Sequence, residues 1–203
     1  MEHSGADTTT ISYYDANAAD FVAGTVGASM RDALGRFAAL LPQGGRVLDW
    51  GCGSGRDAKA LAEAGFQVVA TDASEAMCQA AGNLAGAVGV TTRNEGFLAL
   101  EEEAAYDGIW ACASLLHLRR SALPEAFARA HRALKAGGVL YASFKLGGFE
   151  GYRSGRWFTD LRQADLAALL PAETWQLLET WQSGDVRQGR GDQLWLNFLA
   201  RRA

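Results

Sequence analysis

The sequence predicts an α/β protein whose sheet is doubly wound and mostly parallel, with seven strands and an antiparallel hairpin at the C-terminal end. Short apolar segments alternate along the chain with longer amphipathic segments, an alternation typical of parallel sheets covered by helices. The last two apolar segments, 174–183 and 193–202, flank a short polar stretch and are therefore expected to form the hairpin. The chain has 203 residues, about the size of one domain.

Each element has its own local signal. Gly65 and Gly138 end the helical patterns that begin at 56 and 121. Ser74 precedes a third helical pattern and is expected to cap it, and Thr159 or Asp160 is expected to cap a fourth. The expected helices are 56–65, 74–86, 121–138 and 159–171, and the expected strands are 46–50, 66–72, 87–92, 106–114, 138–146, 174–183 and 193–202.

The domain organisation follows from the same patterns. Residues 1–10 are small and polar and are expected to be disordered, whereas 11–203 are expected to form a single domain. Within it, the apolar spacing of 11–41 predicts an N-terminal helical cap, and 46–203 form the core. Between the strand at 138–146 and the next helix we expect an irregular loop rich in glycine and arginine.

Composition excludes several classes of protein. The three cysteines form no C-x-x-C pair, and His3 and His131 have no partners at ligand spacing, so we expect free thiols and no metal site. The first residues lack the features of a signal peptide, and no apolar stretch approaches the roughly 20 residues that span a bilayer. We expect a cytoplasmic monomer or homodimer without a membrane partner.

The stretch LDWGCGSGRD, residues 48–57, places three glycines directly after the first strand. In doubly wound sheets ligands bind at the carboxyl ends of the strands, and glycines there let the backbone approach a ligand closely. The dinucleotide fingerprint G-x-G-x-x-G needs a glycine where this chain has Arg56. The spacing therefore favours a different nucleotide-like cofactor, with a dinucleotide or a loop without any ligand as the alternatives.

Asp72 ends the second strand and is expected beside the glycine stretch, at the same edge of the sheet. A carboxylate there can accept both hydroxyls of a ribose, whichever of the two cofactor classes is bound. The alternative is that Asp72 caps the following helix, a position that Ser74 already fills. We therefore favour the ribose-binding interpretation.

Three segments resemble motifs of the class I S-adenosylmethionine-dependent methyltransferases. VLDWGCGSGRDAKALAEAGFQVVATDAS (47–74) is similar to the glycine motif and the acidic motif after it, YDGIWACASLLHL (106–118) to the fourth motif, and RALKAGGVLYASF (132–144) to the fifth strand. The resemblance covers about residues 11 to 203 and implies a Rossmann-like methyltransferase fold. Arg56, the opening YYDANAADF (13–21) and the tail segments are most similar to the tellurite-resistance (TehB-like) subgroup.

The resemblance implies S-adenosylmethionine as cofactor and assigns its contacts. Asp49 and the glycine loop would hold the methionine moiety, and Asp72 the ribose. Tyr14 would close over the carboxylate end, with core packing as its alternative. The residues implied to bind the cofactor are Tyr14, Asp49, Gly51, Cys52, Gly53, Arg56, Asp72, Ala73, Met77, Phe97 and Ala111.

One position departs from the family pattern. Many relatives have an aspartate before a phenylalanine, and that aspartate contacts the adenine amino group. This chain has Gly96 before Phe97, in RNEGFLAL. Asn94, Glu95 or a backbone group would have to replace the missing acid.

The methyl acceptor is expected where the loops after 106–114, 138–146 and 174–183 meet. The strand 174–183 should run parallel to the first five, so the loop after it reaches the same edge of the sheet. Four arginines on these loops indicate an anionic acceptor such as an oxyanion or carboxylate, and the alternative is that they are solvated loop residues. The expected acceptor contacts are Tyr13, Arg153, Arg156, Trp157, Arg187 and Arg190.

His117 is the one candidate for a catalytic base, because its unperturbed pKa lies near neutrality. The alternative is a structural histidine that caps its loop or contacts the cofactor. Methyl transfer from a sulfonium is an in-line displacement in which proximity and orientation lower much of the barrier. A base is needed only for a hydroxyl or a similar nucleophile.

We therefore expect an S-adenosylmethionine-dependent methyltransferase that acts on a small acceptor. A tRNA wobble-base methyltransferase is one alternative, which the net charge of −4 and the lack of a basic face disfavour. An NAD(P)-linked oxidoreductase and a non-catalytic S-adenosylmethionine-binding protein are the others. The nucleophilic atom stays open between sulfur, oxygen, nitrogen and a metalloid.

The ribose assignment can be tested directly. Asp72→Ala should weaken binding of S-adenosylhomocysteine by about 1–3 kcal/mol, because hydrogen bonds to a charged group are lost. Calorimetric titration measures this change. An unchanged affinity would remove Asp72 from the cofactor site.

Overall fold

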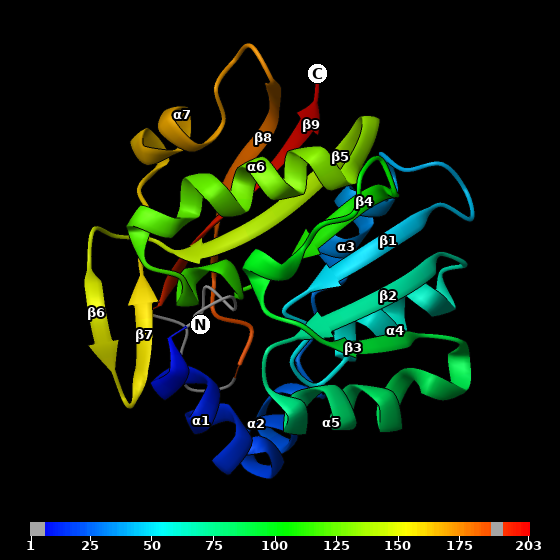
Figure 1. The fold of residues 1–203 in the computed structure, drawn as a ribbon, viewed down its shortest axis with the longest axis vertical. Helices are drawn as coiled ribbons and strands as arrows, with labels where there is room; N and C mark the ends of the chain where they lie inside the picture. Colours follow the sequence, from blue (N-terminus) through cyan, green and yellow to red (C-terminus); the bar gives the residue numbers. More distant parts are fainter. Residues whose placement is uncertain (1–6, 188–192) are drawn as a thin grey trace.

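The computed structural model describes residues 7–187 and 193–203, which form an α/β fold around one seven-stranded sheet (Figure 1). The strands of this sheet are β1 (Arg46–Trp50), β2 (Gln67–Asp72), β3 (Thr91–Asn94), β4 (Tyr106–Ala111), β5 (Leu134–Lys145), β8 (Trp175–Gly184) and β9 (Leu194–Arg202). Their order is β3-β2-β1-β4-β5-β9-β8. The order reverses between β1 and β4, and that reversal marks the crevice in which such sheets bind ligands.

Strand directions confirm the predicted fold class. The first five strands pair in parallel, whereas β9 is antiparallel to both β5 and β8. Strand β8 therefore runs parallel to β5, as predicted. Because of this direction, the segment that follows β8 lies at the same edge of the sheet as the glycine stretch after β1.

Helices cover both faces of the sheet (Figure 1). One face carries α6 (Leu123–Ala133) and α7 (Leu166–Leu169), and the other carries α3 (Arg31–Ala38), α4 (Arg56–Glu63) and α5 (Glu75–Ala85). Short 3-10 turns connect the elements at Gly86–Val88, Phe97–Ala99, Leu115–His117, Arg120–Ala122 and Gln163–Asp165. Among the described residues, none of the helices has the length and hydrophobicity needed to cross a membrane.

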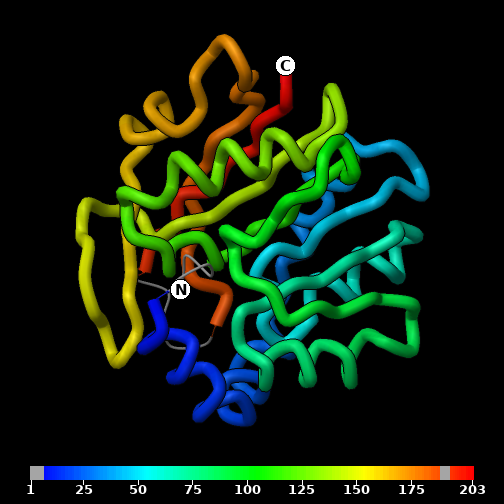
Figure 2. Tube along the Cα trace, in the orientation of Figure 1, coloured from blue at the N-terminus to red at the C-terminus, as the bar shows by residue number. Residues whose placement is uncertain are grey.

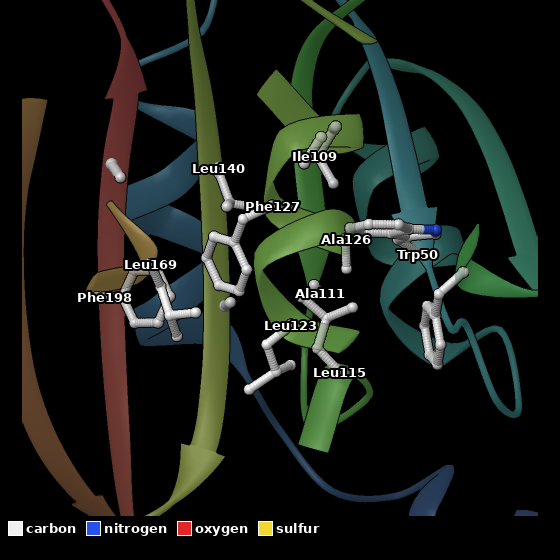
Figure 3. Close-up of a cluster of buried hydrophobic side chains, with 14 of the residues drawn as sticks. Trp50, Ile109, Ala111, Leu115, Leu123, Ala126, Phe127, Leu140, Leu169 and Phe198 are labelled. Atoms are coloured by element: carbon white, nitrogen blue, oxygen red, sulfur yellow. The ribbon is translucent and has the colours of Figure 1, made fainter. Parts of the chain in front are cut away.

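The larger part of the core lies under α6. Figure 3 shows Ala126 and Phe127 of this helix among Trp50 of β1, Leu140 of β5 and Phe198 of β9. All five side chains are at most 1% exposed. The helix packs closely because small alanines and large aromatic residues alternate across the contact, as in other densely packed interiors.

Two N-terminal helices close the carboxyl edge of the sheet. These are α1 (Thr8–Ala16) and α2 (Ala18–Thr25). The tube trace in Figure 2 shows them between α5 and a two-stranded hairpin, β6 (Glu150–Arg153) and β7 (Arg156–Thr159). They therefore form a lid above the ends of β1, β2 and β4.

Several predicted elements need correction. Residues 8–10, expected in a disordered tail, form the first turn of α1 because Asp7 caps it through the N–H of Thr10. The segment expected as an irregular loop forms the β6–β7 hairpin, in which Thr159 belongs to a strand. Asp160 pairs with Arg153 instead of capping a helix, so the helix expected at 159–171 shrinks to α7. The third strand is shifted to Thr91–Asn94.

Gly55 is required by close packing of α4 on α5. It has φ +78°, and a Cβ there would lie 2.7 Å from the Cα of Ala81. Gly65 also has a left-handed conformation, at φ +95°, but a Cβ there would meet no atom within 4 Å. Substitution of Gly65 therefore introduces backbone strain alone, whereas substitution of Gly55 introduces backbone strain and steric overlap.

This difference predicts unequal losses of stability. Gly65→Ala should lower the free energy of unfolding by about 1 kcal/mol, through left-handed strain alone. Gly55→Ala adds overpacking against Ala81 and should cost about 3 kcal/mol. Urea denaturation measures both values, and equal losses would contradict the close approach of the two helices.

Candidate functional site

A cavity of about 310 Å³ lies at the carboxyl edge of the sheet, next to the N-terminal helices. Its walls come from the loops after β1, β2, β4 and β5, from α1, from the β6–β7 hairpin and from the segments that flank residues 188–192. These segments are far apart in the sequence, and the sheet brings them together because the carboxyl ends of its parallel strands share one edge. We therefore take the cavity as the candidate active site.

The glycine loop is held against β2 by its own backbone. The amides of Gly51 and Cys52 both donate to the carbonyl of Thr71, at 2.8 and 2.9 Å. Gly51 has φ +85°, and a Cβ there would collide with the side chain of Ser114. Gly51, Cys52 and Gly53 all line the cavity, so the loop presents backbone groups to it.

Asp72 joins this loop to the helix that follows β2. Its two carboxylate oxygens accept from the backbone N–H groups of Gly53, at 3.0 Å, and Ser74, at 2.9 Å. Ser74 caps α5 as predicted, because its hydroxyl accepts from the N–H of Met77 at 3.2 Å. Burial raises the pKa of Asp72, and the two N–H donors lower it. Asp72 also lines the cavity, where its remaining lone pairs can accept from a ligand.

Asp49, in β1, presents an unsatisfied carboxylate oxygen. Its Oδ2 is buried and has no hydrogen-bond partner among the described residues. Burial raises the pKa of Asp49 well above its usual range, and the charge of Asp57 raises it further. A buried polar atom without a partner is costly. Because Asp49 lines the cavity, a cationic or hydrogen-bond-donating group of a ligand would satisfy it.

Arg56 braces the glycine loop and does not offer a free charge to the cavity. Its guanidinium donates to both carboxylate oxygens of Asp57, at 2.7 and 2.8 Å, and to the carbonyl of Thr25 at 3.3 Å. Asp57 also accepts from the indole N–H of Trp110, at 3.0 Å. Arg56 therefore lines the cavity with its charge neutralised, and it ties α4 to the end of α2.

Three of the residues implied to bind the cofactor lie together. Ala73, Met77 and Phe97 all line the cavity beside Asp72. The ring of Phe97 is fixed edge-on against Trp50, with 5.6 Å between the centroids. This end of the cavity therefore offers apolar surfaces next to the carboxylate of Asp72.

Other expected cofactor contacts lie off the cavity wall. Ala111 is fully buried in the core, and the two residues after it, Cys112 and Ala113, line the cavity instead. Strand β4 ends at Ala111, so only the residues that follow can reach the edge of the sheet. Asn94 donates to the backbone carbonyl at the end of β2, at 3.0 Å, and neither Asn94 nor Glu95 lines the cavity.

Tyr14 of the lid and His117 form a hydrogen bond of 2.8 Å at the cavity wall. The Nδ1 of His117 lies 2.7 Å from the carbonyl oxygen of Trp157, which can only accept, so Nδ1 carries the ring proton. Nε2 therefore accepts from the Tyr14 hydroxyl, which in turn accepts from Nη1 of Arg156 at 3.3 Å. Burial lowers the pKa of His117 to about 4 and raises the pKa of Tyr14, so both side chains are neutral at pH 7.

Two of the expected acceptor arginines are neutralised by carboxylates. Arg153 donates to both oxygens of Asp160, at 2.9 and 2.7 Å. Arg187 donates through Nε to Asp185 at 2.8 Å. Both arginines line the cavity, but the protein itself balances their charge. Arg190 lies outside the described residues.

Arg156 is different, because it forms no ion pair among the described residues and its Nε is buried without a partner. Its guanidinium packs over the rings of Tyr13, at 4.6 Å, and Phe158, at 5.3 Å. Tyr13 supports it from outside and does not line the cavity. The Trp157 side chain is also outside, beneath the guanidinium of Arg119 at 4.2 Å. Of the expected acceptor contacts that the structure describes, one unbalanced arginine and two balanced ones line the cavity.

Sequence reasoning missed several polar residues of the cavity. Lys145, Asp185 and Asn197 line it, together with Trp195. Lys145 is the last residue of β5, and the rule that parallel strands point their carboxyl ends at the ligand could have found it. Asn197 lies within antiparallel β9, where no such rule applies.

The comparisons with known proteins agree on one family. Residues 47–138 match the methyltransferase domain family. YqeM of Bacillus subtilis (strain 168), a protein with a provisional methyltransferase name, is 33% identical over 122 residues. That match covers 53% of the chain and 47% of YqeM, so the chain matches about half the length of this relative.

Solved structures share the whole fold. The 1,6-didemethyltoxoflavin-N1-methyltransferase of Burkholderia thailandensis, solved with 1,6-didemethyltoxoflavin and S-adenosylhomocysteine, superposes with a TM-score of 0.79 at 24% identity, covering 97% of this chain and 88% of that one. TehB of Haemophilus influenzae gives 0.72 at 18%, covering 90% and 66%. A TehB-like methyltransferase of Corynebacterium glutamicum gives 0.69 at 20%, covering 97% and 100%. Residues 47–138 thus match a methyltransferase domain, and the whole chain shares its fold with S-adenosylmethionine-dependent methyltransferases.

The family match covers one end of the cavity. It includes the glycine loop, Asp72 and the loop after β4, which together form the end with the unsatisfied Asp49. The lid helices, the β6–β7 hairpin and the segment after β8 lie outside the match. These elements supply Tyr14, Arg156 and Arg187, so the second end of the cavity is built from segments outside the matched range.

The low pKa of His117 predicts a specific pH dependence of stability. The unfolded chain binds this proton near pH 6.5, whereas the folded chain binds it only near pH 4. Stability should therefore fall as the pH drops from 6.5 to 4, by on the order of 3 kcal/mol from this residue. His117→Gln should remove that part of the decline.

Unfolding by urea at pH 7 and pH 4 measures the effect. His131→Gln is the comparison variant, because His131 is less buried than His117; burial lowers its pKa in the same direction, and its removal should reduce the decline by less. If His117→Gln and the native chain lose stability in parallel, the buried neutral histidine is contradicted.

Proposed function

We propose that this chain transfers a methyl group from S-adenosylmethionine to a small anionic acceptor. One observation carries the proposal: a single cavity joins the glycine loop and Asp72 to Arg156, a cation without a carboxylate partner among the described residues. The first end suits the cofactor and the second suits an anion. The fold of the structural neighbours agrees with this function, and the B. thailandensis neighbour is solved with 1,6-didemethyltoxoflavin and S-adenosylhomocysteine bound.

The residues at the first end fit S-adenosylmethionine. The unsatisfied oxygen of Asp49 suits the ammonium of the methionine moiety, and the glycine loop suits close approach of its chain. Asp72 would accept from the ribose hydroxyls while it keeps its two backbone donors. Ala73, Met77 and Phe97 would flank the adenine. The bound cofactor supplies an electrophilic methyl group on a sulfonium.

Arg156 is the residue that we assign to the acceptor. Arg156 is half-buried, its Nε is fully buried, and it has no counter-ion among the described residues; an anionic acceptor would offset the cost of this lost hydration. A guanidinium can also orient a carboxylate or oxyanion through two parallel hydrogen bonds. The rings of Tyr13 and Phe158 pack against the guanidinium, at 4.6 and 5.3 Å, and so restrict it at the cavity wall.

His117 acts in this proposal as a positioning residue. Its pKa of about 4 makes it a weak proton acceptor at neutral pH. An acceptor that is already anionic needs no general base, since proximity and orientation then lower most of the barrier. The hydrogen bonds of His117 to Tyr14 and to the Trp157 carbonyl instead tie the lid and the hairpin to the loop after β4.

We also place the chain nearest to the TehB-like subgroup. Its support is Arg56, the opening 13–21 and the tail, which meet at the cavity through Tyr14, Arg56 and Arg187. TehB-like proteins are among the structural neighbours, together with other small-molecule methyltransferases.

Calorimetric titration with S-adenosylmethionine, S-adenosylhomocysteine and NAD tests the cofactor. We expect binding of both sulfur compounds and none of NAD; the reverse result would overturn the proposal. Transfer of label from methyl-labelled S-adenosylmethionine is then measured with oxyanions, carboxylates, thiols, phenols and tRNA. Binding without transfer to any of them would indicate a non-catalytic protein, and transfer to tRNA alone would exclude a small acceptor.

The assignment of Arg156 predicts a split in the kinetics. Arg156→Gln should raise KM for an anionic acceptor at least tenfold, a loss of about 1.4 kcal/mol, because one charge-assisted contact disappears. The affinity for S-adenosylhomocysteine should change less than twofold. Arg119→Gln is the control, since its guanidinium lies outside the cavity over Trp157. Equal KM values for the two variants would contradict the acceptor role of Arg156.

A further inference from the structure

Lys145 is a second cation at the acceptor end that has no assigned role. It is the last residue of β5, is half-buried and lines the cavity. Its Nζ donates to the side chain of Gln193 and lies 5.8 Å from the ring centroid of Phe158 and 5.1 Å from that of Trp195. Among the described residues no carboxylate forms an ion pair with it. Its one polar contact is therefore with a neutral amide.

The charges around Lys145 do not cancel. Arg153 and Arg187 are each paired with a buried carboxylate, so these pairs contribute little net charge. Lys145 and Arg156 remain, and both lie within 6 Å of the centroid of the same Phe158 ring. The two unbalanced cations are thus close enough for one small molecule to contact both.

The protein gains no evident stability from this arrangement. Cations taken partly out of water lose hydration, and neither of these two recovers it from an acidic side chain in the described part of the chain. Burial lowers the pKa of Lys145, and the positive charges of Arg187 and Arg153 lower it further, while Asp185 opposes them. Cations that lose hydration without gaining a counter-ion from the protein are typical of binding sites in which the ligand supplies the opposite charge.

Aromatic side chains form the surfaces between the two cations. Phe158 and Trp195 line the cavity next to Lys145, and Tyr14 lines it next to Arg156. Flat aromatic surfaces bury a planar organic frame well, whereas an inorganic oxyanion would leave them without a contact. The combination favours an organic dianion.

We propose that Lys145 is a specificity-determining residue that binds a second anionic group of the acceptor, and that the acceptor is a planar organic molecule with two anionic groups. Arg156 would hold one group and Lys145 the other. This inference rests on the proposed function, because it concerns the acceptor end of the same cavity.

Binding of simple anions to the full chain saturated with S-adenosylhomocysteine tests the inference. Benzene-1,3-dicarboxylate carries two anionic groups on a planar ring, benzoate carries one, and sulfate is a dianion without a ring. We expect calorimetry to give an affinity for the dicarboxylate about tenfold above that for benzoate, and no measurable competition by equimolar sulfate.

Three variants separate the two cations. Lys145→Gln should bring the dicarboxylate to within twofold of benzoate and leave benzoate binding unchanged. Lys145→Arg should keep the preference, and Arg156→Gln should weaken both ligands. Lys135→Gln is the matched control, because Lys135 is a surface lysine paired with Asp107 at 2.8 Å, and it should behave as the native chain does.

The outcomes distinguish an error in the proposed function from an error in the role of Lys145. If S-adenosylhomocysteine itself fails to bind, the proposed function is wrong. If it binds but the native chain holds benzoate and the dicarboxylate equally well, or if Lys145→Gln retains the preference, the role of Lys145 is overturned. Displacement of the dicarboxylate by equimolar sulfate would reject the planar organic acceptor in favour of an inorganic dianion.

Discussion

The carboxylate of Asp72 holds together the parts on which the cavity depends. One oxygen accepts from the glycine loop after β1, and the other accepts from the residue that caps α5. That capping residue, Ser74, also donates to Asp15 of the lid helix α1, at 2.6 Å. Loop, helix and lid are therefore connected through two adjacent polar side chains. A carboxylate suits this position because it can accept several N–H groups and still keep lone pairs for a ligand.

Charge is distributed unevenly between the two ends of the cavity. The cofactor end holds carboxylates, one of which has an oxygen without a partner among the described residues. Among the described residues, the proposed acceptor end holds three arginines and a lysine but two carboxylates, and Arg156 and Lys145 are the cations that form no ion pair. A cofactor that carries an ammonium and a sulfonium next to an anionic acceptor complements this distribution. The neutral Tyr14–His117 pair also lies in the wall of the cavity, and it connects the lid to the hairpin without adding charge.

The sequence predicted the parallel core well and the segment after β5 poorly. Strands β1, β2 and β4 and helices α4 and α5 have strong local patterns, and the structure places them within a few residues of the predicted bounds. Helix α6 also forms, but it ends at Ala133 and not at 138, because β5 already begins at Leu134. The hairpin of β6 and β7 has no such pattern, since its glycines and arginines are also typical of an irregular loop. It forms because Arg153 meets Asp160 and because Trp157 donates its backbone N–H to Thr10 of the lid, at 2.8 Å. Contacts of this kind do not appear in a local pattern.

The stretch LDWGCGSGRD, together with Asp72, predicted from sequence alone the edge of the sheet at which the cavity lies and the class of cofactor to expect there. Its information is local, because glycine spacing and strand ends are properties of neighbouring residues. Which cations remain free was decided only by the tertiary structure. Arg153, Arg156 and Arg187 look alike in the sequence, yet two of them pair with Asp160 and Asp185, and Arg156 has no carboxylate partner among the described residues. Ion pairing depends on distances that the folded chain sets, and so the acceptor end could be understood only once the fold had brought its loops together.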